Sequence, residues 1–178
     1  AALEEARVQG KIRHYGASLD LAAEVRDCLS NTSSEVLEVL FNVCHQDVRH
    51  SFDTVRQHGA GIVAKVPLDS GWLTGRFDAN SRFQGIRVRW SEEEIAQRAK
   101  LVSEIGWLVQ DDAELAHKAI AYLLSYDEVS CVIPGIRTQQ QLESNLLAAD
   151  CRLLPDEVSK LEEFWEQLTE NGSNLLPW

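Results

Sequence analysis

Short apolar runs alternate with stretches of helical periodicity along most of the chain. Four runs have the length and composition of β-strands, at residues 12–18, 36–41, 61–66 and 130–133. The third and fourth runs are largely apolar, which is typical of strands that are buried on both faces.

Helical periodicity follows each of these runs. Residues 21–29 and 47–57 are amphipathic, and the chain also opens in a helical pattern that stops near Gly10. Ser91 with Glu94 is a capping box, Thr138 with Gln141 is another N-cap, and Pro155 suits a first helical turn. Apolar residues at helical spacing follow each of these three helix starts, and a further predicted helix lies between the first two. In chain order these four sets are Ile95, Ala99, Val102 and Ile105; Ala116, Ile120 and Leu123; Leu142, Leu146 and Ala149; and Val158, Leu161, Trp165 and Leu168.

Alternating strands and helices predict an α/β fold with parallel strands joined by crossover helices. A doubly wound sheet and a (β/α)8 TIM barrel both fit this order. A complete barrel needs about 250 residues and eight units, whereas this chain of 178 residues has four. We expect residues 1–178 to form one domain, with the closing residues 171–178 folded back over the body.

Composition excludes several classes of protein. The chain has 17 basic and 28 acidic residues, a net charge of -11, which argues against nucleic-acid binding. No apolar run approaches the roughly 20 residues of a membrane span, and the start lacks the features of a signal peptide. The chain has no methionine and begins inside a helical pattern, so we expect its start to be internal to something longer.

The four cysteines are scattered and form no C-x-x-C pair, which argues against a disulfide framework or a zinc cage: Cys28, Cys44, Cys131 and Cys151. We therefore expect a reducing, cytoplasmic location. The five histidines share no helical face, so we expect no metal site.

A dinucleotide-binding fingerprint is matched only formally. Residues 59–64 read G-x-G-x-x-A, but they follow a predicted helix and enter a predicted strand. The fingerprint must leave a strand and open a helix. A helix C-cap that turns into a strand explains both glycines.

Two loops after predicted strands have the chemistry of anion sites. The first runs from the third strand to Trp90, and from Leu73 onward it contains one acidic residue and four arginines: Arg76, Arg82, Arg87 and Arg89. The second places Gly135 and Arg137 at a helix start, where free N–H groups favour phosphate. The alternatives are surface arginines paired with acidic neighbours, and an ordinary capped helix with an exposed arginine.

Three motifs together resemble the C-terminal half of the aldo-keto reductase barrel: residues 10–18 (GKIRHYGAS), 67–76 (PLDSGWLTGR) and 133–145 (IPGIRTQQQLESN). They occur in the family's order and spacing, and the resemblance extends over essentially all of the chain. It implies the second half of a (β/α)8 barrel and an NADPH-dependent reduction of aldehydes or ketones.

The resemblance also implies site residues. Ser18 matches the serine that holds the nicotinamide carboxamide, although Leu19 replaces the family's Asn. Glu38 replaces a Gln at the same carboxamide, and Lys65 replaces an aromatic residue that stacks on the nicotinamide. The matches to the pyrophosphate loop are Pro67, Leu68, Ser70, Gly71 and Arg76.

The matches to the adenosine-phosphate site are Gly135, Arg137, Gln141 and Asn145, with Ser144 in place of a common Glu. Arg137 is expected to favour NADP(H) over NAD(H), because it adds a fixed charge for the 2′-phosphate.

The family's catalytic tetrad of Asp, Tyr, Lys and His lies on segments before this chain's first residue, so no catalytic residue is assigned. We expect Tyr15, Tyr122 and Tyr126 to be core or surface residues. The chain is then the cofactor-binding half of an oxidoreductase, inactive alone, whose partner is the missing half-barrel or a second copy. The alternatives are a non-catalytic nucleotide-sensing subunit, as in the potassium-channel β-subunits, and an inactive truncated fragment.

Overall fold

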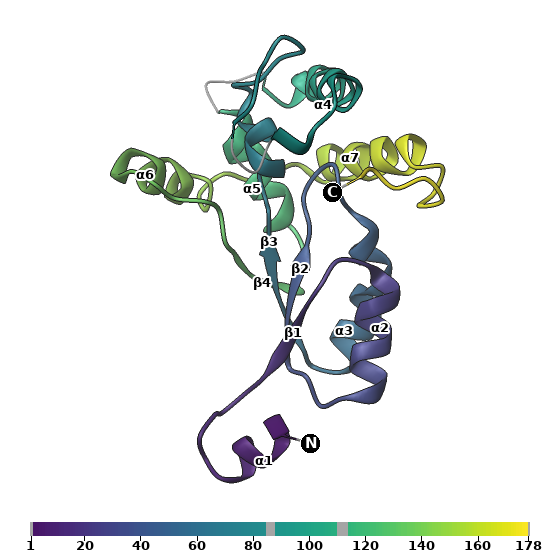
Figure 1. The fold of residues 1–178 in the computed structure, drawn as a ribbon, viewed down its shortest axis with the longest axis vertical. Helices are drawn as coiled ribbons and strands as arrows, with labels where there is room; N and C mark the ends of the chain where they lie inside the picture. The colour runs from purple at the N-terminus through teal and green to yellow at the C-terminus, as the bar shows by residue number, and fades with distance from the viewer. Residues whose placement is uncertain (1, 85–87, 110–113, 178) are drawn as a thin grey trace.

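The computed structural model describes residues 2–84, 88–109 and 114–177. Its centre is a parallel sheet in the order β1-β2-β3-β4 (Figure 1). The strands are β1 (Gly16–Leu19), β2 (Val36–Leu40), β3 (Gly61–Lys65) and β4 (Val129–Val132). Sequential order without a reversal is the order of a barrel wall, whereas a doubly wound sheet reverses at its switch point. The predicted parallel α/β fold is confirmed.

The helices lie where the periodicity places them: α1 (Ala2–Val8), α2 (Ala22–Asn31), α3 (Phe52–Gln57), α4 (Glu92–Glu104), α5 (Leu115–Leu123), α6 (Gln139–Leu147) and α7 (Pro155–Leu168). Short 3-10 helices are η1 (Asp47–Ser51), η2 (Asp69–Thr74) and η4 (Gly106–Leu108). The prediction of a single α-helix over residues 47–57 is therefore partly wrong. Its first five residues form the 3-10 helix η1, and only the rest is α-helical.

The first strand is shorter than predicted. It begins at Gly16, which pairs with Val36, and not at residue 12. A Cβ atom at position 16 would lie 1.5 Å from the carbonyl oxygen of Val36, so only glycine permits this close approach. The preceding Tyr15 instead donates a hydrogen bond to Glu4 of α1.

One face of the sheet holds the main core. Leu37 and Val39 of β2 and Ile62 and Ala64 of β3 are fully buried with residues of α2 and α3, which lie together on one side of the sheet (Figure 1). Fully burying a Leu, Val or Ile side chain contributes about 1.5–3 kcal/mol. This layer therefore fixes the register of the sheet, because a slip of one residue would turn these side chains to the opposite face.

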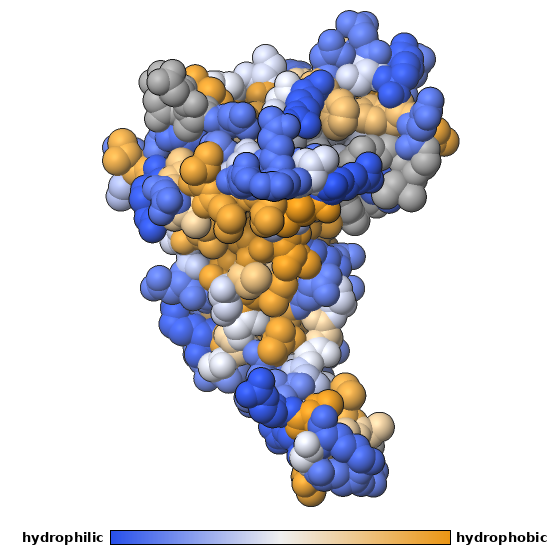
Figure 2. All heavy atoms as spheres, turned by 90° about the vertical axis from the view of Figure 1, so that its left-hand side faces the viewer, coloured by the Kyte–Doolittle hydropathy of each residue, from blue (hydrophilic) through white to orange (hydrophobic). Residues whose placement is uncertain are grey.

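The other face of the sheet remains partly exposed. Val36 is 41% exposed, and Ser130 and Cys131 of β4 are exposed as well. The expectation of burial on both faces is therefore wrong for the fourth strand, whereas in β3 Ile62 and Ala64 are buried and the other residues are half-buried. A broad apolar area runs across the middle of the side seen in Figure 2.

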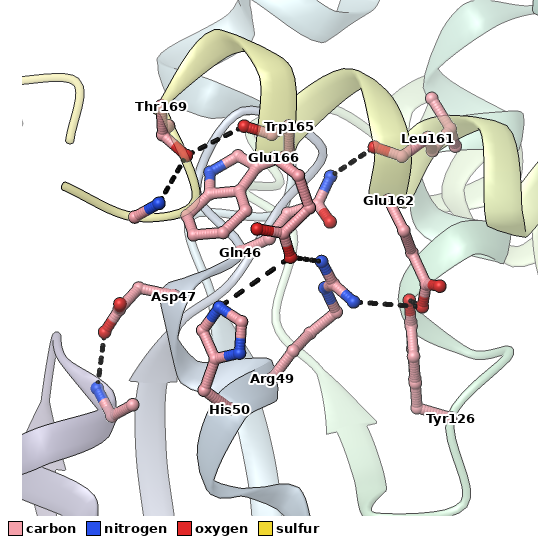
Figure 3. Close-up of polar contacts among 12 residues, drawn as sticks. Gln46, Asp47, Arg49, His50, Tyr126, Leu161, Glu162, Trp165, Glu166 and Thr169 are labelled. Atoms are coloured by element: carbon pink, nitrogen blue, oxygen red, sulfur yellow. Dashed lines mark hydrogen bonds and ion pairs between the residues drawn. The ribbon is translucent and has the colours of Figure 1, made fainter. Parts of the chain in front are cut away.

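Helix α7 docks on the core through a buried polar network (Figure 3). Gln46 donates to the carbonyl of Leu161 at 3.0 Å, and Tyr122 donates to Gln46 at 2.6 Å. Tyr126 donates to Glu162 at 2.6 Å. Burial raises the pKa of both tyrosines, and their place in this network confirms that they are core residues.

The closing segment returns over the body, as predicted. Leu176 packs against the main core, and the carbonyl of Pro177 accepts a hydrogen bond of 2.6 Å from Arg98 of α4. Within the described part of the chain, no helix has the length and hydropathy needed to cross a membrane.

Candidate functional site

A cleft of about 720 Å³ opens between two segments that are far apart in the sequence. One wall is the loop after β3, residues 66–77, which we call the β3 loop. The other is residues 133–147, which we call the α6 segment. The predicted site residues that line the cleft are Pro67, Leu68, Ser70, Gly71, Arg76, Gly135, Arg137, Gln141 and Asn145. The structure thus brings the two predicted anion motifs to one site.

The β3 loop adopts an uncommon backbone conformation. Val66, Asp69 and Ser70 have φ angles of 56°, 43° and 54°, and Gly71 has a φ of 102°. Such left-handed conformations cost roughly 1–3 kcal/mol each for residues other than glycine and persist only where their surroundings fix them. The amide of Gly71 donates to the carbonyl of Leu68 at 2.8 Å, which closes the turn.

An aromatic cluster supports the β3 loop from behind. Trp72 is fully buried, and its ring lies 5.5 to 5.8 Å from the rings of Phe77, Phe83 and Trp90. The Trp72–Phe77 pair is edge-to-face and the other two are tilted, and aromatic pairs add about 0.5–1.5 kcal/mol each to the burial itself. The long connection to Trp90 therefore has its own small core.

The α6 segment is organised by its cap. Thr138 accepts a hydrogen bond of 3.2 Å from the amide of Gln141, as predicted. The side chain of Gln141 in turn accepts a bond of 2.7 Å from the amide of Arg137. These two bonds fix the turn that presents Arg137 and the helix N-terminus to the cleft.

Asn145 has a polar atom to offer a ligand. Its side-chain nitrogen is buried and has no hydrogen-bond partner among the described residues, while Asn145 itself lines the cleft. Next to it, Ser144 lies 2.9 Å from the Nε2 atom of His117. A buried amide without a partner is costly, so a ligand acceptor at this position would stabilise it.

The predicted arginine cluster of the β3 loop does not assemble as a unit. Arg76 lines the cleft, but Arg82 binds the carbonyls of Asn80 and Ser81, and Arg89 stacks over Trp90. Arg87 lies outside the described residues. The expectation of one anion site built from all four is corrected, since local carbonyls and an aromatic ring hold two of them.

The three residues predicted at the nicotinamide lie apart from the cleft lining. Ser18 pairs in register with Glu38 on the partly exposed face of the sheet. The Nζ atom of Lys65 donates to Ser18 at 2.9 Å and also lies 2.9 Å from Asp20. Lys65 is thus drawn toward the end of β1, where its charge is neutralised.

The formal dinucleotide fingerprint is explained as predicted. Helix α3 ends at Gln57, Gly59 takes a φ of 64° in the turn, and β3 begins at Gly61. Across the described residues, no group of three or more His, Cys, Asp or Glu side chains is arranged to hold a metal ion.

The sequence analysis missed the support behind the β3 loop. Asp69 and Arg98 are each 1% exposed and lie 3.4 Å apart. A signal was available, because Arg98 falls three residues after Ile95 on the apolar stripe of α4. A charged residue within an apolar stripe indicates a buried partner.

Comparison with known proteins agrees with this architecture. The aldo/keto reductase family model matches residues 1–166. The uncharacterized oxidoreductase YqkF of Bacillus subtilis is 26% identical over 162 residues, with 89% of this chain and 52% of that protein covered.

Two solved structures have the same fold. An aldo-keto reductase of Bacillus halodurans superposes with a TM-score of 0.72 at 20% identity, covering 90% of this chain and 52% of that one. An aldo-keto reductase of Klebsiella pneumoniae in complex with NADPH gives 0.65 at 20% identity, covering 92% and 52%. The chain therefore spans about half the length of these relatives. On the extent of the family match, the chain belongs to the aldo-keto reductase family.

Proposed function

We propose that this chain is the cofactor-binding part of an NADP(H)-dependent oxidoreductase that reduces aldehydes or ketones. The observation behind this proposal is the cleft itself, in which a left-handed glycine loop with Arg76 faces a helix N-terminus with Arg137. Backbone N–H groups and arginines are the donors that phosphates prefer. A Klebsiella relative in complex with NADPH supports the choice of cofactor.

Each wall of the cleft would hold a different part of the cofactor. Ser70, Gly71 and Arg76 would meet the pyrophosphate, with Pro67 and Leu68 as the apolar wall. Arg137, Gln141 and Asn145 would meet the adenosine and its 2′-phosphate, and Gly135 would allow the backbone to approach closely. The unpartnered amide of Asn145 and the two arginines fit this ligand.

The nicotinamide end would lie over the carboxyl ends of the strands. Ser18 and Glu38 would meet the carboxamide there, and the aliphatic stem of Lys65 would cover the ring while its Nζ atom stays with Asp20 and Ser18. When bound, the cofactor supplies the hydride for the carbonyl carbon. The chain's own residues bind and orient the cofactor.

The proton donor is not assigned to this chain. Tyr122 and Tyr126 belong to the core network that docks α7, in which Figure 3 shows Tyr126 beside Glu162. Tyr15 donates to Glu4. The acid that protonates the carbonyl would come from the rest of the whole protein, whose proposed compartment is the cytoplasm. A nucleotide-sensing subunit without catalysis would use the same cleft, and an inactive fragment would bind no nucleotide.

We also propose that the partly exposed sheet face meets another polypeptide. Each outer strand, β1 and β4, has one edge without a strand partner among the described residues, and unpaired edges recruit strands. The partner would be the complementary half-barrel or, without it, a second copy. Size-exclusion chromatography with light scattering tests this: we expect self-association of the 178-residue chain, and a cooperative monomer of 20.0 kDa would contradict it.

Binding and turnover measured together test the proposed function. We expect the chain to quench or shift NADPH fluorescence saturably but to show no turnover with 4-nitrobenzaldehyde, since general acid catalysis contributes about 10²–10⁴-fold. Binding with turnover would show a catalytic acid within this chain. Absence of NADPH binding would overturn the proposal.

A further inference from the structure

Asp69 is a buried carboxylate at the centre of the β3 loop. Its Oδ2 atom lies 3.4 Å from the Nε atom of Arg98, and its Oδ1 atom lies 3.5 Å from the Nε2 atom of His45. A carboxylate removed from water must be compensated by charge or hydrogen bonds, so Arg98 is what allows Asp69 to stay buried.

Arg98 connects the loop to two other segments. It lies in the second turn of α4, its Nη2 atom donates to the carbonyl of Pro177 at 2.6 Å, and its guanidinium stacks 5.1 Å over Trp90. Arginine suits this role because its planar fork reaches several partners at once. The β3 loop, α4 and the returning C-terminal segment thus meet at one side chain.

The residues with left-handed backbone conformations include Asp69 of this buried pair and the adjacent Ser70. Asp69 itself has a φ of 43° and Ser70 a φ of 54°, and Ser70 with Gly71 lines the cleft. A short polar side chain is tolerated in this conformation, but the strain persists only where the surroundings fix it. The packing of Asp69 against Arg98 supplies that constraint next to the cleft.

We propose that Asp69 is a positioning residue, which through Arg98 holds Ser70 and Gly71 in the conformation that meets the cofactor's pyrophosphate. This inference rests on the proposed function, and it adds a role for two residues that do not touch the cleft. Because the constraint acts on one wall only, it predicts a selective effect on ligands that reach the β3 loop.

The test uses Asp69→Asn, which keeps the side-chain volume, with two ligands measured by fluorescence titration and competition. We expect the dissociation constant of NADPH to rise about tenfold. Adenosine 2′-monophosphate, which has no 5′-phosphate and so reaches only the α6 segment in our assignment, should bind as it does to the wild type. The matched control is Glu128→Gln, which removes a buried carboxylate paired with Arg56 outside the cleft lining and should leave both affinities unchanged.

A second variant separates positioning from stability. Asp69→Asn alone leaves Arg98 as a lone buried charge, whereas Asp69→Asn with Arg98→Met leaves none. We expect the double variant to regain thermal stability while the NADPH affinity stays low, and it replaces the single variant if that one does not fold. Affinity that returns with stability, equal loss for both ligands, or unchanged NADPH affinity would overturn the inference alone. Failure of the wild type to bind NADPH would overturn the proposed function as well.

Discussion

The two walls of the cleft are built in different ways. In the β3 loop, Asp69, Trp72 and Leu73 are buried, and an ion pair and an aromatic cluster hold the backbone in left-handed conformations. In α6 no residue is buried, and Leu146 is 62% exposed. One wall is fixed by tertiary contacts, whereas the other relies on its cap and on packing against α5. In the function we propose, pyrophosphate binding would then depend on residues remote from the ligand, whereas the choice between NADPH and NADH would depend on exposed side chains of α6 and its cap.

Truncating one large side chain in each wall should give the largest contrast. Trp72→Ala empties the centre of the aromatic cluster and should lower the free energy of unfolding by about 3–5 kcal/mol. Leu146→Ala removes an exposed side chain from α6 and should change it by less than about 0.5 kcal/mol. Urea denaturation measures both. Similar losses for the two variants would show that α6 is packed as tightly as the loop.

Adding a methyl group at one glycine in each wall isolates the backbone conformation. Gly75 has a φ of 71°, whereas the φ of Gly135 lies outside the left-handed region, and an added Cβ would meet nothing within 4 Å at either position. Gly75→Ala should therefore destabilise the fold by about 1 kcal/mol, and Gly135→Ala should leave it unchanged or slightly more stable.

The same pair of variants sharpens the assignment of the α6 segment. Gly135 lines the cleft and an added Cβ there meets no protein atom within 4 Å. If the cofactor approaches the backbone of Gly135 as we propose, the NADPH dissociation constant of Gly135→Ala should rise about tenfold although stability does not fall. Denaturation and NADPH titration on the same samples check this. A stable Gly135→Ala variant with wild-type affinity would remove Gly135 from the site.

Local hydrogen bonding explains which features were predictable from the sequence. The caps at Ser91 and Thr138 form as their spacing predicts, and β2 and β3 each end one residue before the predicted boundary. These features depend on residues a few positions apart. The pairing of Asp69 with Arg98 joins residues 29 positions apart, and no local pattern specifies such a partner.

The candidate site divides in the same way. The two anion motifs were identified from glycines and arginines near strand ends, and they do line one cleft. Arg82 and Arg89 are an exception, because their partners lie only one or two positions away. Backbone carbonyls occur at every position, so no residue pattern indicates which arginine they will hold. The position of Lys65 depends on Asp20 across the sheet.

The smallest expected difference between the two regions concerns the N-caps of α4 and α6. These caps should differ in how their contribution to the free energy of unfolding changes with pH. A hydrogen bond from the amide of Ser91 lowers the pKa of Glu94 below its ordinary value of 4.5. Its contribution to stability is therefore complete above that value and is lost as the pH falls through the lowered pKa. The cap of α6, Thr138 with Gln141, has no group that titrates in this range.

Denaturation between pH 7 and pH 3 separates the two caps. Glu94→Gln should cost about 0.3 kcal/mol near neutrality, because the group is exposed to solvent, and the difference from the wild type should vanish in acid. Thr138→Ala should cost about 1 kcal/mol at every pH. A loss for Glu94→Gln that does not change with pH would rule out the charged cap.

The ratio of the NADH to the NADPH dissociation constant, measured for the wild-type chain and for Arg137→Ala, tests the central claim most directly. A charge-assisted bond to the 2′-phosphate is worth about 1.5–3 kcal/mol, so NADPH should bind the wild type at least about tenfold more tightly. Arg137→Ala should abolish this preference. The control Arg13→Ala, which removes an exposed arginine near the start of the chain and outside the cleft lining, should preserve it. Equal affinities in the wild type, or a preference that survives Arg137→Ala, would contradict the assignment of this cleft to NADP(H).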